Sequence, residues 1–338
     1  MLIPLQLPPG VHANGTEFES SNRWREASLV RWHDGSMRPV GGWTVRKPSA
    51  FTYAPRAMIA YLDNDSDEHM AAGTYDKLYY VNPSLTVTDI TPSSGFTSGS
   101  LNGALNLGYG GGFMGSTNYG RAPTSSGVYA EATTWSLDTW GEYLLGVSST
   151  DGKLLEWQGN PSANAAVVAN APVDNLAMVV TEERFVFCLG AGGNPRKVAW
   201  SDKENNTLWS AAATNEAGDM ELQTNGQIMC GVRMRGATLI LTSEDAHLAT
   251  YSGAPFVYGF QRVGTACGIA SRKAAVAIDE GAFWMGKKGF YTFNGSTATE
   301  IACEVADYVF DDLNPSQVSK VYAVHNSQFG EIWWFYPS

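Results

Sequence analysis

Five histidines are the side chains in this sequence best suited to acid–base or metal chemistry, and their spacing supports neither. They are His12, His33, His69, His247 and His325. None forms an HxH, HxxxH or HExxH pattern, the local spacings at which two imidazoles reach one metal ion. The sequence also lacks a GxSxG elbow, a Walker loop and a Rossmann fingerprint. We therefore expect turn, strand or surface histidines, with no catalytic residues, no bound metal and no cofactor.

An acidic run, DNDSDE from Asp63 to Glu68, resembles the start of a calcium loop. Alternate carboxylates in such a loop converge on one cation. However, Glu68 stands where the sharp turn needs glycine, and Thr74 stands where the bidentate acid belongs. A solvated hairpin turn between two strands is the better interpretation.

The glycine-rich run YGGGFMGSTNYG, Tyr109 to Gly120, is a weak phosphate-loop candidate. No Lys-Ser/Thr follows it and no apolar-periodic helix begins there. It lies within a longer Gly/Ser/Asn-rich insertion, Ser93–Gly127. We expect a loop that bridges two sheets or reaches a neighbouring molecule.

The run AWSDKENNTLWS, Ala199 to Ser210, resembles an aspartate box through Ser201, Asp202 and Trp209. It lacks the glycine of that motif, and such boxes are structural turns. Glycoside hydrolysis would need two facing carboxylates, or a tyrosine nucleophile with an arginine cluster. No such set can be nominated from the sequence.

Composition favours a large all-β protein. The 338 residues are 44% hydrophobic and only 16% charged, with 36 glycines and 11 tryptophans. This apolar content argues against disorder, and no run approaches the ~18 apolar residues of a membrane helix. The first fifteen residues contain three prolines and no basic stretch, which is not typical of a secretion signal. We expect the chain to be made and kept in the cytosol until it is assembled or released.

The four cysteines are widely spaced and form no CxxC pair: Cys188, Cys230, Cys267 and Cys303. A chain of this size has enough core to fold without disulfides. We therefore expect reduced, buried thiols.

Charge is unevenly distributed along the chain. The net charge is −11, which argues against tight, non-specific binding to nucleic acid. Residues 1–56 nevertheless hold seven basic and four acidic residues, +3, which leaves −14 for the rest. This pattern fits a basic arm that docks on an acidic neighbour, such as another copy of the chain, and it fits an ordinary solvated surface equally well.

A repeated unit of short apolar strands and tight turns organises the chain. The second strands of the units begin at steps of 42 to 53 residues, after a first step of 74 that contains the glycine-rich insertion. This period is typical of four-stranded β-propeller blades. A third strand often ends in an aromatic residue and a turn, as in Trp157-Gln158-Gly159 and Phe293-Asn294-Gly295. One sheet cannot bury both faces alone, so each must pack against the next around an axis.

The two ends of the chain differ from the repeats. Residues 1–50 read as an arm with a hairpin whose turn is His33–Ser36, and residues 51–338 read as the propeller. The last strand, from Glu331, is apolar and would leave an exposed edge. Either the N-terminal hairpin pairs with it, or the chain continues and the last blade is incomplete; we favour the second. The one helical signal is Cys303–Asn314.

Several long stretches resemble one family of bacteriophage tail proteins. They are LPPGVHANGTEFESSNRWREASLVRWHDGSMRPVGGW, TTWSLDTWGEYLLGVSSTDGKLLEWQGN, GNPRKVAWSD, TNGQIMCGVRMRGATLILTSEDAHLATYSG and FGEIWWFYPS. The resemblance runs from about Pro4 to Ser338. It is to the packaged-DNA stabilisation or tail nozzle proteins of short-tailed phages.

This resemblance implies a structural virion protein with a β-propeller that forms a ring, a homo-hexamer, below the portal and adaptor of the head-to-tail connector. Such nozzles line the exit channel, retain the packaged genome until ejection, and contact tail fibres or spikes. The implied location is the virion tail, assembled in the bacterial cytoplasm, with no membrane in the virion. Viral DNA would pass without specific contacts, and an acidic body would not grip its phosphates.

The alternative is a carbohydrate-binding or receptor-binding β-propeller. Trp140, Trp157 and Trp209 lie near predicted strand ends, where indoles can stack on sugars. Packing between sheets explains the same tryptophans.

Overall fold

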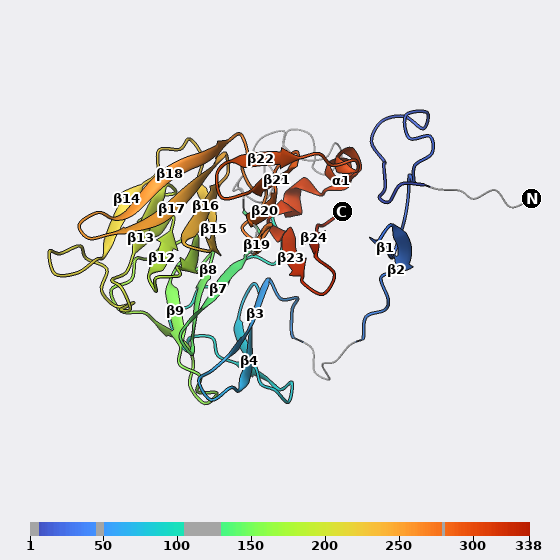
Figure 1. Cartoon of the computed structure of the whole chain (residues 1–338). Helices are drawn as coiled ribbons and strands as arrows, with labels where there is room; N and C mark the ends of the chain where they lie inside the picture. Colours follow the sequence, from blue (N-terminus) through green and yellow to red (C-terminus); the bar gives the residue numbers. More distant parts are fainter. Residues whose placement is uncertain (1–6, 45–50, 105–129, 279–280) are drawn as a thin grey trace, which may run out of the picture.

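The computed structural model describes residues 7–44, 51–104, 130–278 and 281–338. These residues form strands and turns almost throughout (Figure 1). Their one α-helix is α1 (Ala306–Asp312), inside the predicted helical segment, and the 3-10 turn η2 (Pro315–Lys320) follows it. The prediction of an all-β protein is confirmed.

Within the described ranges, five four-stranded antiparallel sheets follow one another, and a two-stranded sheet comes last. Sheets 1 and 2 are β3 (Ala57–Leu62), β4 (Glu68–Gly73), β5 (Leu78–Val81), β6 (Val87–Asp89), β7 (Trp135–Trp140), β8 (Tyr143–Ser148), β9 (Leu154–Trp157) and β10 (Ala166–Val167). Sheets 3 and 4 are β11 (Ala177–Val180), β12 (Val186–Leu189), β13 (Lys197–Trp200), β14 (Gly218–Glu221), β15 (Ile228–Met234), β16 (Ala237–Thr242), β17 (Asp245–Gly253) and β18 (Val257–Thr265). Sheets 5 and 6 are β19 (Ala275–Ile278), β20 (Gly281–Met285), β21 (Phe290–Phe293), β22 (Ala298–Ile301), β23 (Tyr322–Asn326) and β24 (Glu331–Phe335).

The predicted repeat of short apolar strands and tight turns corresponds to most of these strands. It missed β10 and β14, the outermost strands of sheets 2 and 3. The two residues of β10 are exposed, and β14 reads Gly-Asp-Met-Glu with three exposed residues. Neither has the alternating β-branched or aromatic residues that mark a strand. Each is ordered by its backbone ladder to the preceding strand.

The predicted turns after the third strands are confirmed. Gly159 and Gly295 have φ values of 80° and 92°, which side chains rarely tolerate. The aromatic residues before them, Trp157 and Phe293, are fully buried. The turn glycine therefore lets the chain reverse directly after its aromatic residue has entered the core.

Apolar side chains fill the space between each sheet and the next. One cluster joins sheets 1 and 2 through Tyr80 and Trp157, whose ring centroids are 4.7 Å apart. Further clusters join sheets 2 and 3, sheets 3 and 4, and sheets 4 and 5, the last extending to Trp334 of sheet 6. Each inner sheet thus buries both faces against its neighbours, as blades of a β-propeller do.

The first strands of the sheets lie at the centre of this arrangement. Each of β3, β7, β11, β15 and β19 contacts the first strand of the next sheet. An ion pair also crosses the centre, from Arg233 on β15 to Asp138 on β7, at 3.7 Å. Side chains from the first strands of sheets 2 and 4 therefore touch, although β11 lies between these strands. The first strands must converge on a common centre, which we call the hub.

The first and last sheets are joined by loops, in a region we call the seam. Gly103 follows sheet 1 and Gln317 precedes sheet 6, and these two residues form two hydrogen bonds. Gly103 N donates to Gln317 Oε1 at 3.1 Å, and Gln317 Nε2 donates to Gly103 O at 2.9 Å. The N–H of Ala132 donates to Ser319 Oγ at 3.1 Å. Arg272, before sheet 5, pairs with Glu131, before sheet 2. The seam is therefore polar, unlike the apolar gaps between the other sheets.

Gly103→Ala should lower the free energy of unfolding by about 1–3 kcal/mol, the usual cost of forcing an atom into packed structure. A Cβ at this position would lie 2.1 Å from the backbone oxygen of Ser316, which cannot rotate away. Gly42→Ala is the matched control, because nothing lies within 4 Å of its Cβ position. Urea denaturation of both variants measures the difference; equal losses would contradict a close contact at the seam.

Candidate functional site

The N-terminal arm, residues 7–44, lies outside the stacked sheets and beside sheet 6 (Figure 1). Its hairpin pairs β1 (Val30–His33) with β2 (Ser36–Pro39), as the sequence predicts. Among the described residues, the hairpin and sheet 6 are separate two-stranded sheets. The backbone pairing between them that the sequence left open is not formed, and their contact runs through side chains.

The start of the arm is held by backbone hydrogen bonds to the segment before α1. The N–H groups of Ala13 and Asn14 donate to Glu304 O at 2.9 and 3.0 Å. Asn14 Nδ2 donates to Cys303 O at 3.0 Å, and the Arg23 guanidinium pairs with the Glu304 carboxylate. A basic arm thus meets an acidic residue of the body.

A buried arginine makes the second contact of the arm. The Arg31 side chain is 8% exposed, and its Nε lies 3.5 Å from Glu331 Oε1 on β24. Its guanidinium carbon also lies 3.5 Å from the centre of the Phe329 ring, close enough for a cation–π interaction. The Trp43 and Trp333 rings meet edge to face at 5.9 Å. The hairpin is therefore anchored at one charged point and one aromatic point.

The arm carries large apolar side chains that are mostly exposed. Phe18 is 88% exposed, Leu29 is 73% exposed and Trp43 is 78% exposed. A two-stranded hairpin has too little apolar contact to be stable alone. Exposed apolar side chains gathered on one segment are typical of an interaction surface. We call Phe18, Leu29 and Trp43 the arm apolar residues and take them as the candidate assembly surface.

The histidines do not come together. His12 lies 3.5 Å from Glu304, His33 lies 3.4 Å from Asp34, and His325 is on β23. His247 is buried with its Nε2 3.2 Å from Asp245 Oδ1. Across the residues with described positions, no three His, Cys, Asp or Glu side chains are grouped to hold a metal ion.

The acidic run at Asp63 forms the turn between β3 and β4, as predicted. Asp63 Oδ1 accepts hydrogen bonds from the N–H groups of Asp65 and Asp67, both at 2.9 Å. Its Oδ2 lies 2.8 Å from His69 Nε2, and this contact, together with the backbone donors, lowers the pKa of Asp63. His69 Nδ1 lies 2.9 Å from the hydroxyl of Tyr80, a buried residue. The carboxylate is thus used to hold a turn.

The segment resembling an aspartate box is also a turn. Asp202 Oδ1 accepts a hydrogen bond from Glu216 N at 2.8 Å, and Trp209 Nε1 donates to Asn206 O at 2.7 Å. Of the tryptophans that could stack on sugars, Trp157 is 1% exposed and Trp140 is 8% exposed. Both pack between sheets, and only Trp209 is half-buried. The structure therefore offers no sugar platform at Trp140 or Trp157.

All four cysteines are free thiols, as the sequence predicts. Cys188, Cys230 and Cys267 are buried, and Cys303 is half-buried beside the arm. Burial raises the pKa of Cys230 to about 12 and that of Cys267 to about 11, and it raises the pKa of Cys188 further. Such thiols are poor nucleophiles at neutral pH.

The glycine-rich motif Tyr109–Gly120 lies outside the described residues. The described start of the insertion contacts the body, since Ser100 N donates to Thr133 Oγ1 at 2.7 Å. No helix in the described ranges is long and apolar enough to cross a bilayer.

No family model and no curated protein matches this chain. Solved structures of propeller proteins are similar in arrangement. Virginiamycin B lyase from Staphylococcus aureus has a TM-score of 0.46 at 7% identity, covering 90% of this chain and 82% of that one. BBS1N, solved in complex with ARL6DN, has a TM-score of 0.43 at 13% identity, covering 79% and 72%. The extracellular domain of BT4673 from B. thetaiotaomicron has a TM-score of 0.43 at 10% identity, covering 84% and 38%. At these identities the likeness carries nothing about activity.

Proposed function

We propose that this chain is a structural, non-enzymatic subunit of a bacteriophage tail. In this proposal it forms a homo-hexameric nozzle ring below the portal and adaptor. The ring lines the exit channel, retains the packaged genome until ejection, and contacts fibres or spikes. The long sequence stretches that resemble tail nozzle proteins support it, and the propeller fold is compatible with it.

The observation that carries the proposal is the arm. It projects from the propeller, is anchored through Arg31 and Glu304, and leaves the arm apolar residues uncovered. A ring is built from heterologous contacts, in which one surface of a subunit meets a different surface of the next. An arm that extends beyond its own body can supply one side of such a contact. The neighbouring copy would then cover Phe18, Leu29 and Trp43.

The experiment measures assembly of the full chain by mass photometry and negative-stain electron microscopy, alone and with a purified head-to-tail connector. We expect rings of six copies. A variant with Phe18→Ser, Leu29→Ser and Trp43→Ser should stay monomeric with an unchanged far-UV spectrum. The control is Val173→Ser with Leu208→Ser, two exposed apolar residues of the body. The control should still form rings.

Two results would overturn the proposal. One is a chain that remains monomeric with and without the connector; the other is specific binding on a glycan array, which favours the carbohydrate-binding alternative. Rings that form normally in the arm variant would reject the assigned surface. A ring structure with a net basic channel lining would contradict passage of DNA along an acidic wall.

A further inference from the structure

The hairpin of the arm has one apolar face that is directed away from sheet 6. Arg31 lies on the other face, where it contacts Glu331 and Phe329 of the last hairpin. Neighbouring residues of a strand point to opposite faces, and directly opposed residues share one. We call the four residues that share the face opposite Arg31 the hairpin apolar face: Val30, Trp32, Met37 and Pro39. Met37 is 39% exposed and Pro39 is also exposed, so this face is available for contact.

Sheet 1 has large apolar side chains on the face turned away from sheet 2. Ile59 and Tyr80 belong to the core between sheets 1 and 2. The residues on either side of Ile59 along β3 point the other way, and Met58 is 45% exposed. Leu62, at the end of the same strand, is 61% exposed. We call the residues of this second face the sheet 1 outer face: Met58, Ala60, Leu62 and Met70.

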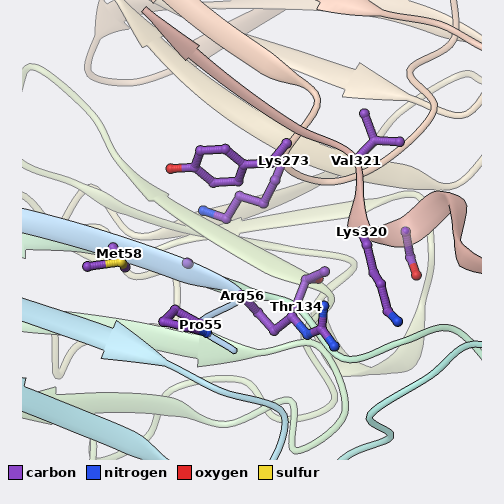
Figure 2. Close-up of a pocket in the computed structure, with 10 residues that line it drawn as sticks. Pro55, Arg56, Met58, Thr134, Lys273, Lys320 and Val321 are labelled. Carbon is purple, nitrogen blue, oxygen red and sulfur yellow. The ribbon is translucent and has the colours of Figure 1, made fainter. Parts of the chain in front are cut away.

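Two hollows lie along the sheet 1 outer face. The larger, of about 430 Å³, is lined by Ala60, Leu62, Met70 and Val81 and by the turn that follows β5. The smaller, of about 210 Å³, lies at the hub between the start of β3 and the segment before β23. Figure 2 shows Met58 at this hollow, with Val321 on another of its walls. Sheet 6 therefore leaves part of the sheet 1 outer face open to large side chains.

Charges of opposite sign accompany the two apolar faces. The turn after Leu62 carries exposed Asp65 and Asp67, and exposed Glu68 lies directly opposite Leu62. None of these three carboxylates forms an ion pair with a residue of described position. Arg38, next to Met37 on β2, is exposed and is likewise without an ion pair in the described ranges. Complementary charges at the rim of an interface steer association and fix its orientation.

We propose that the hairpin apolar face of one copy packs on the sheet 1 outer face of the next copy, with Arg38 beside the carboxylates of the β3–β4 turn. Two β-sheets that pack face to face bury side chains of both. The chain carries both surfaces, and they differ, so the contact can repeat from copy to copy. Its own hairpin is held beside sheet 6 through Arg31 and lies apart from β3 and β4 in Figure 1, which favours a second copy. This inference rests on the proposed ring and names the surface that receives the arm.

The experiment crosslinks full chains through introduced cysteines. Copies with Met37→Cys are mixed with copies with Leu62→Cys, oxidised, and separated on a denaturing gel. We expect a crosslinked dimer in the mixture and monomers in each variant alone, with the unaltered chain measuring the background from its native cysteines. Met220→Cys, on β14, is the matched control because Met220 is 46% exposed. It should give no dimer with Met37→Cys above that background.

One chain that carries both Met37→Cys and Leu62→Cys should give a ladder of crosslinked multimers. A crosslinked monomer would overturn the proposal, because the hairpin would then close on its own sheet 1. A dimer of Met37→Cys alone would also overturn it, because two hairpins would then face each other.

Serine substitutions measure the contribution of the apolar contact. Met58→Ser with Leu62→Ser should weaken association of the copies about tenfold or more, since both side chains become buried only on contact. The control is Met220→Ser with Val167→Ser, two strand residues of similar exposure in sheets 3 and 2. Mass photometry over a concentration series measures both, with far-UV circular dichroism to confirm folding. Equal weakening would overturn the assigned surface.

Charge reversal tests the orientation. Arg38→Glu should weaken association about two- to tenfold, and less at high salt, because it places like charges together. Adding Asp67→Lys and Glu68→Lys to Arg38→Glu should restore association. Failure of the combined variant to recover would overturn this orientation.

Failure of the inference and failure of the proposed function give different results. Normal rings without the crosslink between Met37→Cys and Leu62→Cys would overturn the inference and leave the proposed function intact. Crosslinked dimers that never form rings would support the contact and overturn the ring. Absence of both rings and crosslinks would overturn both.

Discussion

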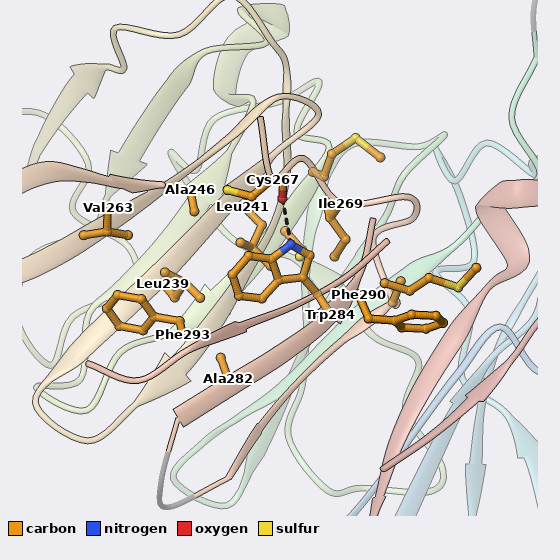
Figure 3. Packing of buried hydrophobic residues seen from close by; sticks show 14 of the residues in the cluster. Leu239, Leu241, Ala246, Val263, Cys267, Ile269, Ala282, Trp284, Phe290 and Phe293 are labelled. Atoms are coloured by element: carbon orange, nitrogen blue, oxygen red, sulfur yellow. Dashed lines mark hydrogen bonds between the residues drawn. The ribbon is translucent and has the colours of Figure 1, made fainter. Parts of the chain in front are cut away.

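Trp284→Ala should lower the free energy of unfolding by about 3–5 kcal/mol, the usual cost of removing a fully buried tryptophan. Trp284 lies on β20 and packs between sheets 4 and 5 (Figure 3), where no part of its side chain is exposed. Its Nε1 donates to the backbone oxygen of Cys267 at 2.7 Å. The change leaves both a cavity and an unpaired buried carbonyl. Guanidinium denaturation followed by circular dichroism measures the loss.

Two further variants separate the contributions at Trp284. Trp284→Phe keeps most of the apolar volume and removes the indole donor, so it should lose less than Trp284→Ala. Trp333→Ala, on the half-buried β24, should also lose clearly less, since its side chain is only partly buried. Equal losses for Trp284→Ala and Trp333→Ala would contradict a stabilising core between sheets 4 and 5.

Glu131→Gln should lower the free energy of unfolding by about 2–4 kcal/mol, because it leaves a buried guanidinium without its counter-charge. The Arg272 side chain is 5% exposed, and Glu131 is the acid that pairs with it. Glu131 is 21% exposed, so water can solvate it when Arg272 is removed. Arg272→Met should therefore cost less than Glu131→Gln.

The double variant Glu131→Gln with Arg272→Met tests the coupling. It should be more stable than Glu131→Gln alone, since no buried charge remains unpaired. Lys287→Met provides the comparison at an exposed pair with Glu244, 3.1 Å apart, where we expect a loss below about 1 kcal/mol. Additive losses in the double variant would show that Arg272 and Glu131 do not hold the seam together.

Local sequence patterns were enough to place most of the fold. Alternating apolar residues, a turn signal and an aromatic end locate three strands of nearly every sheet, because those strands bury side chains on both faces. The outer strands β10 and β14 bury little, so composition does not mark them. These two strands are held by backbone hydrogen bonds to the preceding strand of their sheet. Such bonds exist only once the sheet has folded.

The candidate sites depended more strongly on tertiary structure. Charge counting left open whether the basic arm docks on an acidic neighbour or is an ordinary solvated surface, and it did not identify the contacts of Arg23 and Arg31 with Glu304 and Glu331 of the same chain. Exposure of Phe18, Leu29 and Trp43 could not be read from the sequence, because apolar residues there look like any short core segment. No motif spacing linked Arg272 to Glu131, which lie 141 residues apart in the chain.

The sequence by itself determined that this is an all-β chain of repeated sheets with reduced thiols and without a sequence-local metal motif. Only the tertiary structure decided which charges pair with one another. Glu131 and Arg272 belong to segments far apart in the chain, and they pair because the segments before sheets 2 and 5 meet at the seam. The period of a repeat sets how each sheet forms, whereas contacts between segments far apart in the chain follow from how the sheets pack together.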